Sequence, residues 1–148
     1  MHPDIKELEF DYIIDGIYIG TNRCCQVHFD EKLKKEGIEV DISLEENVLD
    51  NPFGIDFFLW LPVPDHNPPK PDQQEFGVSA IKKFVEMNKK IYVHCKNGHG
   101  RAPTLVMAYL ISKGLSLEEA INLISEKRPS IHLEDVQLAA LKGFADKK

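Results

Sequence analysis

The chain alternates between segments with a hydrophobic period of two and segments with a period near 3.6, which predicts strands separated by helices. Within Tyr12–Gly20, two short apolar runs flank Asp15 and Gly16. An Asp-Gly pair between β-forming residues predicts a tight hairpin. Three further strands are predicted where apolar residues alternate or run together: Ile38–Leu44, Ile55–Val63 and Ile91–Val93.

Helical periodicity marks five segments, and several carry start or stop signals. Two begin with the spacing of a capping box, in which the first and fourth side chains satisfy exposed N–H groups: Asp72 with Glu75, and Ser116 with Glu119. Glycine, which tolerates the left-handed backbone after a helix, follows two others. The predicted helices cover approximately 29–36, 72–88, 102–113, 116–128 and 133–144.

This order of elements predicts an α/β fold, with a central mixed, mainly parallel sheet flanked by helices. The 148 residues suffice for one domain, expected over 1–148, with a core that needs no disulfide or metal support. Apolar residues make up 43% of the chain and charged residues 28%, which are proportions of a globular protein.

Charge and composition argue against several classes of function. The formal net charge of −6 has the wrong sign for a general nucleic-acid binder. No segment approaches the roughly 20 apolar residues of a membrane span. The first ten residues lack the pattern of a signal peptide, so a cytoplasmic location is expected.

The three cysteines do not suggest a disulfide framework, because their number is odd. Cys24 and Cys25 are adjacent, and a bond between them would be strained. Buried packing is the expected role of this pair, with a redox partnership to Cys95 as the alternative.

The segment 94–101 reads HCKNGHGR and lies between a predicted strand and a predicted helix. A helix N-terminus presents unpaired N–H groups and a partial positive charge, and a tight loop can aim further N–H groups at the same point. Gly98 and Gly100 permit the backbone conformations of such a cradle. Arg101 can grip two phosphate oxygens at once. The predicted phosphate-binding loop therefore consists of Lys96, Asn97, Gly98, His99, Gly100 and Arg101.

Cys95 stands where the strand enters this cradle. The dipoles that bind phosphate also stabilise a thiolate, and a thiolate aimed at a phosphoryl group is a nucleophile. A buried, unreactive cysteine is the alternative for Cys95 taken alone. The two glycines and Arg101 at this spacing favour the nucleophile.

The run HCKNGHGR resembles the signature of the protein tyrosine phosphatase superfamily, which is His-Cys, five residues and Arg. The resemblance extends to an opening hairpin at 14–20, to a proline-rich segment LPVPDHNPP and to a late helix AINLISEKRPSI. The small size is similar to that of the dual-specificity branch. The resemblance implies hydrolysis of phosphotyrosine and phosphoserine or phosphothreonine in proteins, through a phosphocysteine intermediate and without metal or cofactor.

Asp65 is the predicted general acid. It lies in the segment Pro62–Pro71, which holds five prolines and is expected to be a loop. The resemblance places the proton donor for the leaving oxygen in this loop. Asp72 and Asp56 are competing carboxylates, but the first is explained by its capping box and the second by its position in a strand.

The resemblance also gives His94 a supporting role, in which its ring bonds nearby backbone and tunes the nucleophile. Lys96 and His99 add positive potential at the rim of the cradle. They are similar to the basic residues of phosphoinositide and other non-protein phosphatases, so a non-protein phosphate ester is the alternative substrate. A phosphate-binding module without catalysis is a second alternative, which the joint presence of Cys95, Asp65 and Arg101 disfavours.

One position departs from the family pattern. Ser or Thr normally follows the signature arginine and stabilises the thiolate that leaves during hydrolysis of the intermediate, but this chain has Ala102. Thr104 is two residues further on and is expected to point elsewhere on the helix, whereas Asn97 can replace that hydroxyl only if the loop turns its amide inward.

Overall fold

The computed structural model describes residues 7–24 and 28–147. Five strands form one sheet in the order β1-β2-β5-β3-β4. Only β1 is antiparallel to its neighbour, so the predicted mixed, mainly parallel sheet is confirmed. The strands are β1 (Phe10–Ile14), β2 (Ile17–Gly20), β3 (Ile38–Ser43), β4 (Phe57–Trp60) and β5 (Lys90–His94).

Asp15 and Gly16 form the predicted hairpin turn between β1 and β2. Both have positive φ, 57° and 84°, which is the conformation that a two-residue turn between twisted strands requires. The Asp15 carboxylate also accepts hydrogen bonds from the Tyr109 hydroxyl (2.7 Å) and Lys113 Nζ (2.5 Å). The turn is thereby tied to the end of a distant helix.

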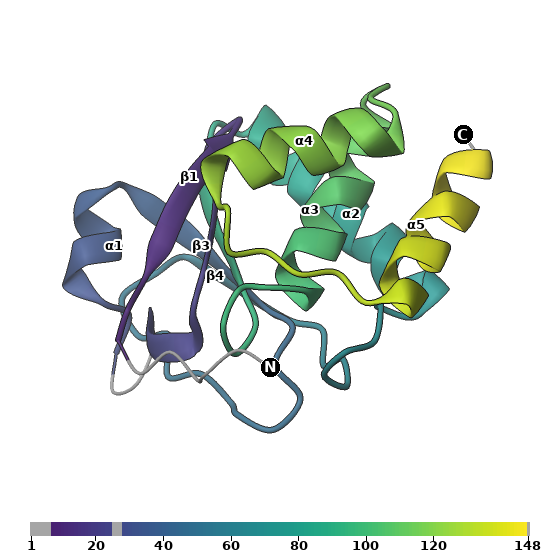
Figure 1. The fold of residues 1–148 in the computed structure, drawn as a ribbon. Coiled ribbons are helices and arrows are strands. Elements are labelled where there is room, and N and C mark those ends of the chain that lie inside the picture. The colour runs from purple at the N-terminus through teal and green to yellow at the C-terminus, as the bar shows by residue number, and fades with distance from the viewer. Residues whose placement is uncertain (1–6, 25–27, 148) are drawn as a thin grey trace.

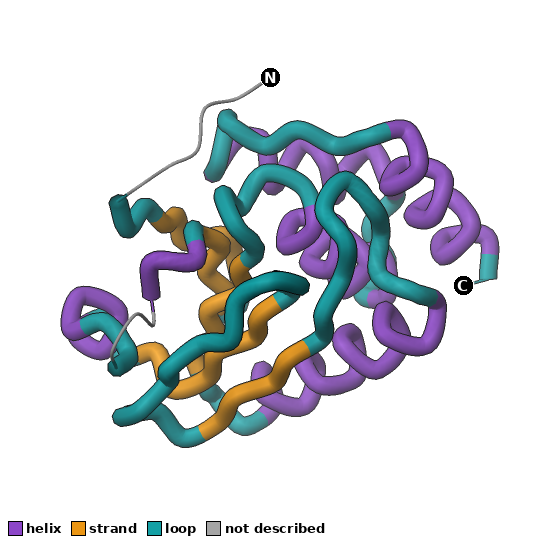
Figure 2. Tube along the Cα trace, turned by 90° about the horizontal axis from the view of Figure 1, so that it is seen from below, coloured by secondary structure: helices purple, strands orange, loops and turns teal. Residues whose placement is uncertain are grey.

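Helices cover both faces of the sheet: α2, α3, α4 and α5 lie on one face, and the short η1 and α1 lie on the other (Figure 1). Figure 2 shows the strands between α1 and the larger group of helices. The helical elements are the short 3₁₀ helix η1 (Asn22–Cys24), α1 (Glu31–Lys35), α2 (Pro71–Glu86), α3 (Arg101–Ser112), α4 (Leu117–Lys127) and α5 (Asp135–Asp146). None of these helices is both long and apolar enough to cross a membrane.

Each face of the sheet has its own hydrophobic cluster. Ile17 and Ile91 point to the larger cluster with α2–α5, whereas the next residues along the chain, Tyr18 and Tyr92, point to a smaller cluster with η1 and α1. This alternation is the period of two expected of strands. Helix α3 is buried from Arg101 to Ile111, so it fills the centre of the larger cluster.

Two sequence predictions are wrong in detail. The capping box at Asp72 does not form, because α2 begins at Pro71 and Gln73 Oε1 accepts the N–H of Lys70 instead. The apolar run Ile55–Val63 also predicts that Phe57, Phe58 and Trp60 are core residues of a central strand, and they are not. β4 is an edge strand, and Phe57, Phe58 and Trp60 are 37–40% exposed. The capping box of Ser116 with Glu119 is confirmed by both reciprocal hydrogen bonds.

Candidate active site

A cavity of about 550 Å³ opens where β5 ends and α3 begins. Three segments that are far apart in the chain line it. They are the proline-rich loop 62–71 with Asp65 (the acid loop), the phosphate loop 96–101 with the preceding Cys95, and the segment 132–137 that leads from α4 into α5. The lining residues are Asp65, His66, Cys95, Lys96, Asn97, His99, Gly100, Arg101, His132, Glu134 and Gln137. Sequence analysis named the residues from the first two segments, except His66, and it did not place the third segment here.

The phosphate loop turns sharply between the strand and the helix. Gly98 has φ +69°, and a Cβ there would lie 2.7 Å from the Gly20 carbonyl oxygen and 2.8 Å from an Arg128 nitrogen. Glycine is required at this position for both reasons. Cys95 precedes the turn and is almost fully buried, with its side chain among the residues of the larger cluster.

Arg128 supports the loop from behind, a role that sequence analysis missed. Its side chain is fully buried. Nε donates to the Gly98 carbonyl at 2.9 Å and Nη2 donates to the Asn97 carbonyl at 2.8 Å, while Nη1 bonds the Asp11 carboxylate at 2.8 Å. Because the guanidinium holds these loop carbonyls on the outside, it favours a loop whose N–H groups face inward.

Arg101 is anchored so that part of its guanidinium remains available to a ligand. Nη1 donates to the Val63 carbonyl at 2.9 Å and lies 3.4 Å from the Leu44 carbonyl. Nε has no hydrogen-bond partner among the described residues and lies 3.5 Å from Asp65 Oδ1. A buried guanidinium nitrogen without a partner is costly, and a phosphate oxygen would satisfy it.

The acid loop is held over the cavity by the connection into α5. His66 Nδ1 lies 2.8 Å from Glu134 Oε2, and Gln137 Nε2 donates to the Asn67 carbonyl at 3.2 Å. His66 has φ +69°, an unfavourable conformation for a residue with a side chain, and such strain is often found at functional sites. These contacts place the Asp65 carboxylate at the mouth of the cavity.

The competing carboxylates lie elsewhere. Asp72 caps the N–H of Gln73 at the start of α2, and Asp56 lies 3.7 Å from Lys89 Nζ at the far end of β4. Neither is among the residues that line the cavity. The geometry therefore favours Asp65 as the proton donor.

The residue after Arg101, Ala102, carries no hydroxyl. Ala102 is fully buried, and the Thr104 hydroxyl donates to the Gly100 carbonyl at 2.7 Å. This bond turns the Thr104 hydroxyl proton back along its own helix. Of the adjacent cysteines, Cys24 is fully buried in the smaller cluster and is disulfide-bonded, so the expectation of packing without a disulfide is wrong for this residue. Cys25 lies outside the described residues.

His94 is fully buried, and the expectation that its ring bonds nearby backbone is wrong. Nε2 bonds a side chain, and Nδ1 has no hydrogen-bond partner among the described residues. Nε2 lies 2.8 Å from Asp50 Oδ2 and 3.0 Å from Asp41 Oδ1. Burial disfavours the charged ring, but the two carboxyl groups outweigh burial and raise the pKa of His94 to about 10. Neither aspartate was singled out from the sequence.

Comparison with known proteins identifies similar sequences. The family described as "Dual specificity phosphatase, catalytic domain" matches residues 17–147. The human "Phosphatidylglycerophosphatase and protein-tyrosine phosphatase 1" is 40% identical over 77 residues, which are 51% of this chain and 38% of that protein. The human "Protein tyrosine phosphatase type IVA 3" is 34% identical over 129 residues, which are 85% of this chain and 64% of that protein. The chain thus spans less than two thirds of the length of either relative.

Solved structures share the fold over nearly the whole chain. The crystal structure of human DUSP28 has a TM-score of 0.85 at 19% identity, and covers 99% of this chain and 98% of that one. The crystal structure of PTPMT1 in complex with PI(5)P has a TM-score of 0.79 at 26% identity, and covers 93% of this chain and 95% of that one.

Proposed function

The chain belongs to the dual-specificity phosphatase family, and from this premise we propose that it hydrolyses phosphate monoesters through a phosphocysteine intermediate. The observation that carries the proposal is the convergence of Cys95, Arg101 and Asp65 in one cavity. A module that only binds phosphate has no need of a nucleophile and a proton donor on the same cavity.

In the first step, the Cys95 thiolate attacks the phosphorus atom. Nε of Arg101 and the inward N–H groups of the phosphate loop hold the non-bridging oxygens and stabilise their charge. An S–P bond forms as the P–O bond to the leaving group breaks. The Asp65 carboxyl group gives its proton to the leaving oxygen, which departs as an alcohol or phenol.

In the second step, water attacks the phosphorus atom of phosphocysteine. Asp65, now a carboxylate, takes a proton from that water. The S–P bond breaks, Cys95 returns to the thiolate and inorganic phosphate leaves. Atoms and charges balance without a metal or a cofactor.

Phosphorylated proteins are the first candidate substrate, carrying phosphotyrosine and phosphoserine or phosphothreonine, as the family name suggests. A phospholipid or other non-protein phosphate ester is the second candidate. Two observations favour it: relatives are named for phosphatidylglycerophosphate, and one similar structure contains PI(5)P. Lys96, His99 and His132 also line the cavity and can meet additional negative charge.

A panel of substrates tests both parts of the proposal. An aryl phosphate, phosphopeptides, phosphatidylglycerophosphate and soluble inositol phosphates would be ranked by kcat/KM, with Cys95→Ser as the inactive control. We expect turnover of the aryl phosphate that Cys95→Ser lacks. Full activity of Cys95→Ser would refute the mechanism, and the ranking decides between the two candidate substrates.

A further inference from the structure

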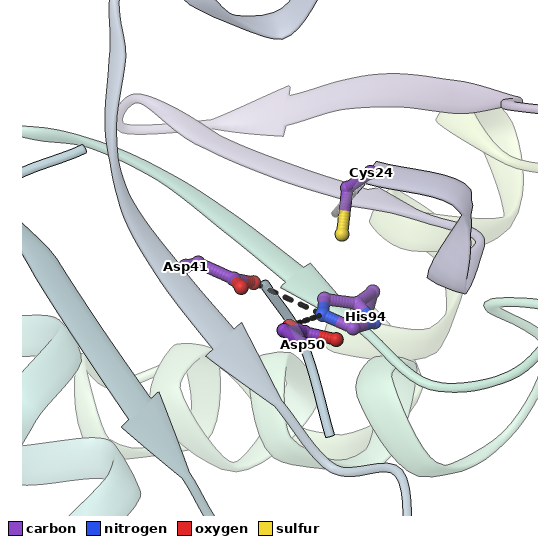
Figure 3. A group of neighbouring side chains, drawn as sticks. All are labelled: Cys24, Asp41, Asp50 and His94. Atoms are coloured by element: carbon purple, nitrogen blue, oxygen red, sulfur yellow. Dashed lines mark hydrogen bonds and ion pairs between the residues drawn. The ribbon is translucent and has the colours of Figure 1, made fainter. Parts of the chain in front are cut away.

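His94, the residue directly before Cys95, belongs to a buried ionic cluster (Figure 3). Its members are Asp41, Asp50 and His94, and all three side chains are at most 1% exposed. Nε2 of His94 points between the two carboxyl groups, at 3.0 Å from Asp41 and 2.8 Å from Asp50. Nδ1 has no hydrogen-bond partner among the described residues, so the side-chain hydrogen bonds of the ring all run through Nε2.

The strands explain how the cluster forms. In the parallel pair β3–β5, Asp41 lies opposite Tyr92 and Ser43 opposite His94. Asp41 is therefore diagonal to His94 on the same face of the sheet, the face with η1 and α1. Asp50 comes from the segment between β3 and β4. Cys95, one residue beyond His94, points to the opposite face with α3.

Two buried carboxylates cannot both stay ionised beside one imidazole without large cost. Burial raises the pKa of Asp41 to about 7, and a hydrogen bond with Asp50 contributes to the rise. Burial also acts against ionisation of Asp50, but hydrogen bonds with His94 and Asp41 outweigh it and lower the pKa of Asp50. The consistent arrangement below pH 7 is a protonated Asp41 that donates to an Asp50 carboxylate, which accepts a second hydrogen bond from a cationic His94. The charge pairing with Asp50 then outweighs the cost of the buried, unpaired Nδ1–H of His94.

We propose that Asp41 and Asp50 are positioning residues, which hold the His94 ring as a cation behind Cys95 and thereby favour its thiolate. This inference rests on the proposed role of Cys95. A positive charge fixed next to the nucleophile stabilises the thiolate in addition to the loop dipoles. Asp41 would also keep Asp50 ionised, because the hydrogen bond that the Asp41 carboxyl group donates stabilises the Asp50 carboxylate.

Two other side chains face the cluster, the titratable Tyr92 and the disulfide-bonded Cys24, which does not titrate. The Tyr92 ring stacks on His94 with centroids 5.5 Å apart. Burial, together with the nearby Asp41, raises the pKa of Tyr92 well above its ordinary value. The sulfur of Cys24 from η1 lies within 4.8 Å of a carboxyl oxygen of Asp41, a carboxyl oxygen of Asp50 and a ring nitrogen of His94. Tyr92 therefore stays neutral across the working pH range and adds no charge to the cluster.

Nuclear magnetic resonance of the wild-type protein tests the cation directly. With ¹⁵N-labelled histidine, the ring nitrogens of six histidines would be followed from pH 5 to 9. We expect one ring to keep both nitrogens protonated at pH 8, and the signal that is absent in His94→Gln assigns it. A neutral His94 tautomer at pH 7 would overturn the proposal.

Alkylation of Cys95 by iodoacetamide tests whether the cluster favours the Cys95 thiolate, and it does not require turnover. Rates would be measured from pH 4 to 9, with Cys95→Ser to subtract other cysteines. Asp50→Asn removes the anion, so we expect the half-maximal pH to rise by about one unit and the rate at low pH to fall about tenfold. Asp41→Asn can still donate to Asp50 and is expected within about twofold of wild type, whereas Asp41→Leu should behave like Asp50→Asn.

Several outcomes distinguish this role from packing alone. A folded Asp50→Asn variant with an unchanged alkylation profile would refute the proposal. So would equal losses in Asp41→Asn and Asp41→Leu, because only the second lacks the donor. One equivalent of bound zinc in the purified protein that is lost in Asp41→Asn would show that these residues form a metal site, and would overturn the proposal. Alkylation reports the thiolate itself and does not depend on turnover. Failure of the proposed role of Asp41 and Asp50 can therefore be distinguished from failure of the proposed phosphatase function.

Discussion

At the scale of single residues, the contact between Asp65 and Arg101 connects the two halves of the proposed reaction. Oδ1 of Asp65 lies 3.5 Å from Nε of Arg101, the nitrogen that is available to phosphate. A phosphate bound at this nitrogen would therefore have the carboxyl group beside it. In the proposed mechanism, the proton donor Asp65 and the phosphate clamp Arg101 are therefore positioned relative to each other before any substrate binds.

Asp65→Asn should lower kcat by roughly 10²–10⁴-fold for alkyl phosphates, because a positioned proton donor contributes that much. The loss should shrink for aryl phosphates with acidic phenols, which leave without help. The measurement is kcat for a series of leaving groups. Asp72→Asn is the matched control, since it removes a carboxylate from the neighbouring helix start and should change little. An equal loss for both ester types would exclude Asp65 as the acid.

Ala102 should make breakdown of phosphocysteine the slow step. A hydrogen bond to a charged group is worth about 1.5–3 kcal/mol, or roughly 10- to 100-fold in rate, and no hydroxyl follows Arg101. Rapid mixing with an aryl phosphate should release a burst of about one equivalent of phenol per enzyme.

Ala102→Ser should raise kcat and shrink this burst. Thr104→Val is the control, because the Thr104 hydroxyl bonds the Gly100 carbonyl and should not contribute to the second step. If wild type shows no burst and the serine variant is no faster, another group stabilises the thiolate, and Asn97 would be the next residue to vary.

Single residues were predictable where the chemistry is local in sequence. Cys95, Arg101 and the loop between them lie within seven positions, and their spacing alone implies a phosphate cradle. Arg128, Asp41 and Asp50 act over separations of 30 or more residues. An isolated arginine before a proline, or an aspartate in an alternating strand, carries no local signal of its partner. These residues become visible only when the packing of the sheet is known.

At the scale of elements, Arg128 joins the end of α4 to the phosphate loop and to β1. Arg128→Lys should lower kcat/KM by about 10- to 100-fold, because one ammonium cannot replace three guanidinium nitrogens that bond Gly98, Asn97 and Asp11. Affinity for vanadate, a phosphate analogue, should fall in parallel. Lys127→Met, an exposed neighbour on the same helix, is the control. Unchanged vanadate affinity in Arg128→Lys would show that the loop keeps its shape without the guanidinium.

Element types were predicted better than element ends. The hairpin at Asp15-Gly16, the strand β3 and the helix α4 have turn or cap residues that leave few alternatives. The start of α2 was misplaced because Pro71 is favourable at the first helical position, which moved the cap to Lys70. The exposure of β4 was missed because an apolar run is compatible with a central or an edge strand, and only pairing decides between them.

At the scale of the whole molecule, the two faces of the sheet hold different parts of the candidate site. The face with α3 receives Cys95, and the face with α1 receives the charged cluster of Asp41, Asp50 and His94. Burying these charged groups makes the free energy of unfolding depend on pH. The protons that hold the cluster together are bound more tightly in the folded state than in the unfolded chain.

The free energy of unfolding should therefore fall as pH rises from 5 to 9. Asp41 has an ordinary pKa of 3.8 and a folded value of about 7, so its contribution is greatest below pH 3.8 and is lost as pH rises through 7. His94 has an ordinary pKa of 6.5 and a folded value of about 10, so its contribution is complete below pH 6.5 and is lost through pH 10. Urea denaturation of wild type and Asp41→Asn at pH 5, 7 and 9 tests the contribution of Asp41. The variant should show a shallower decline between pH 5 and 7. Its decline from His94 should begin at a lower pH than in wild type, because Asp41 contributes to the raised pKa of His94. Parallel curves across the whole range would mean that Asp41 is already ionised at pH 5, and that the shared proton is absent.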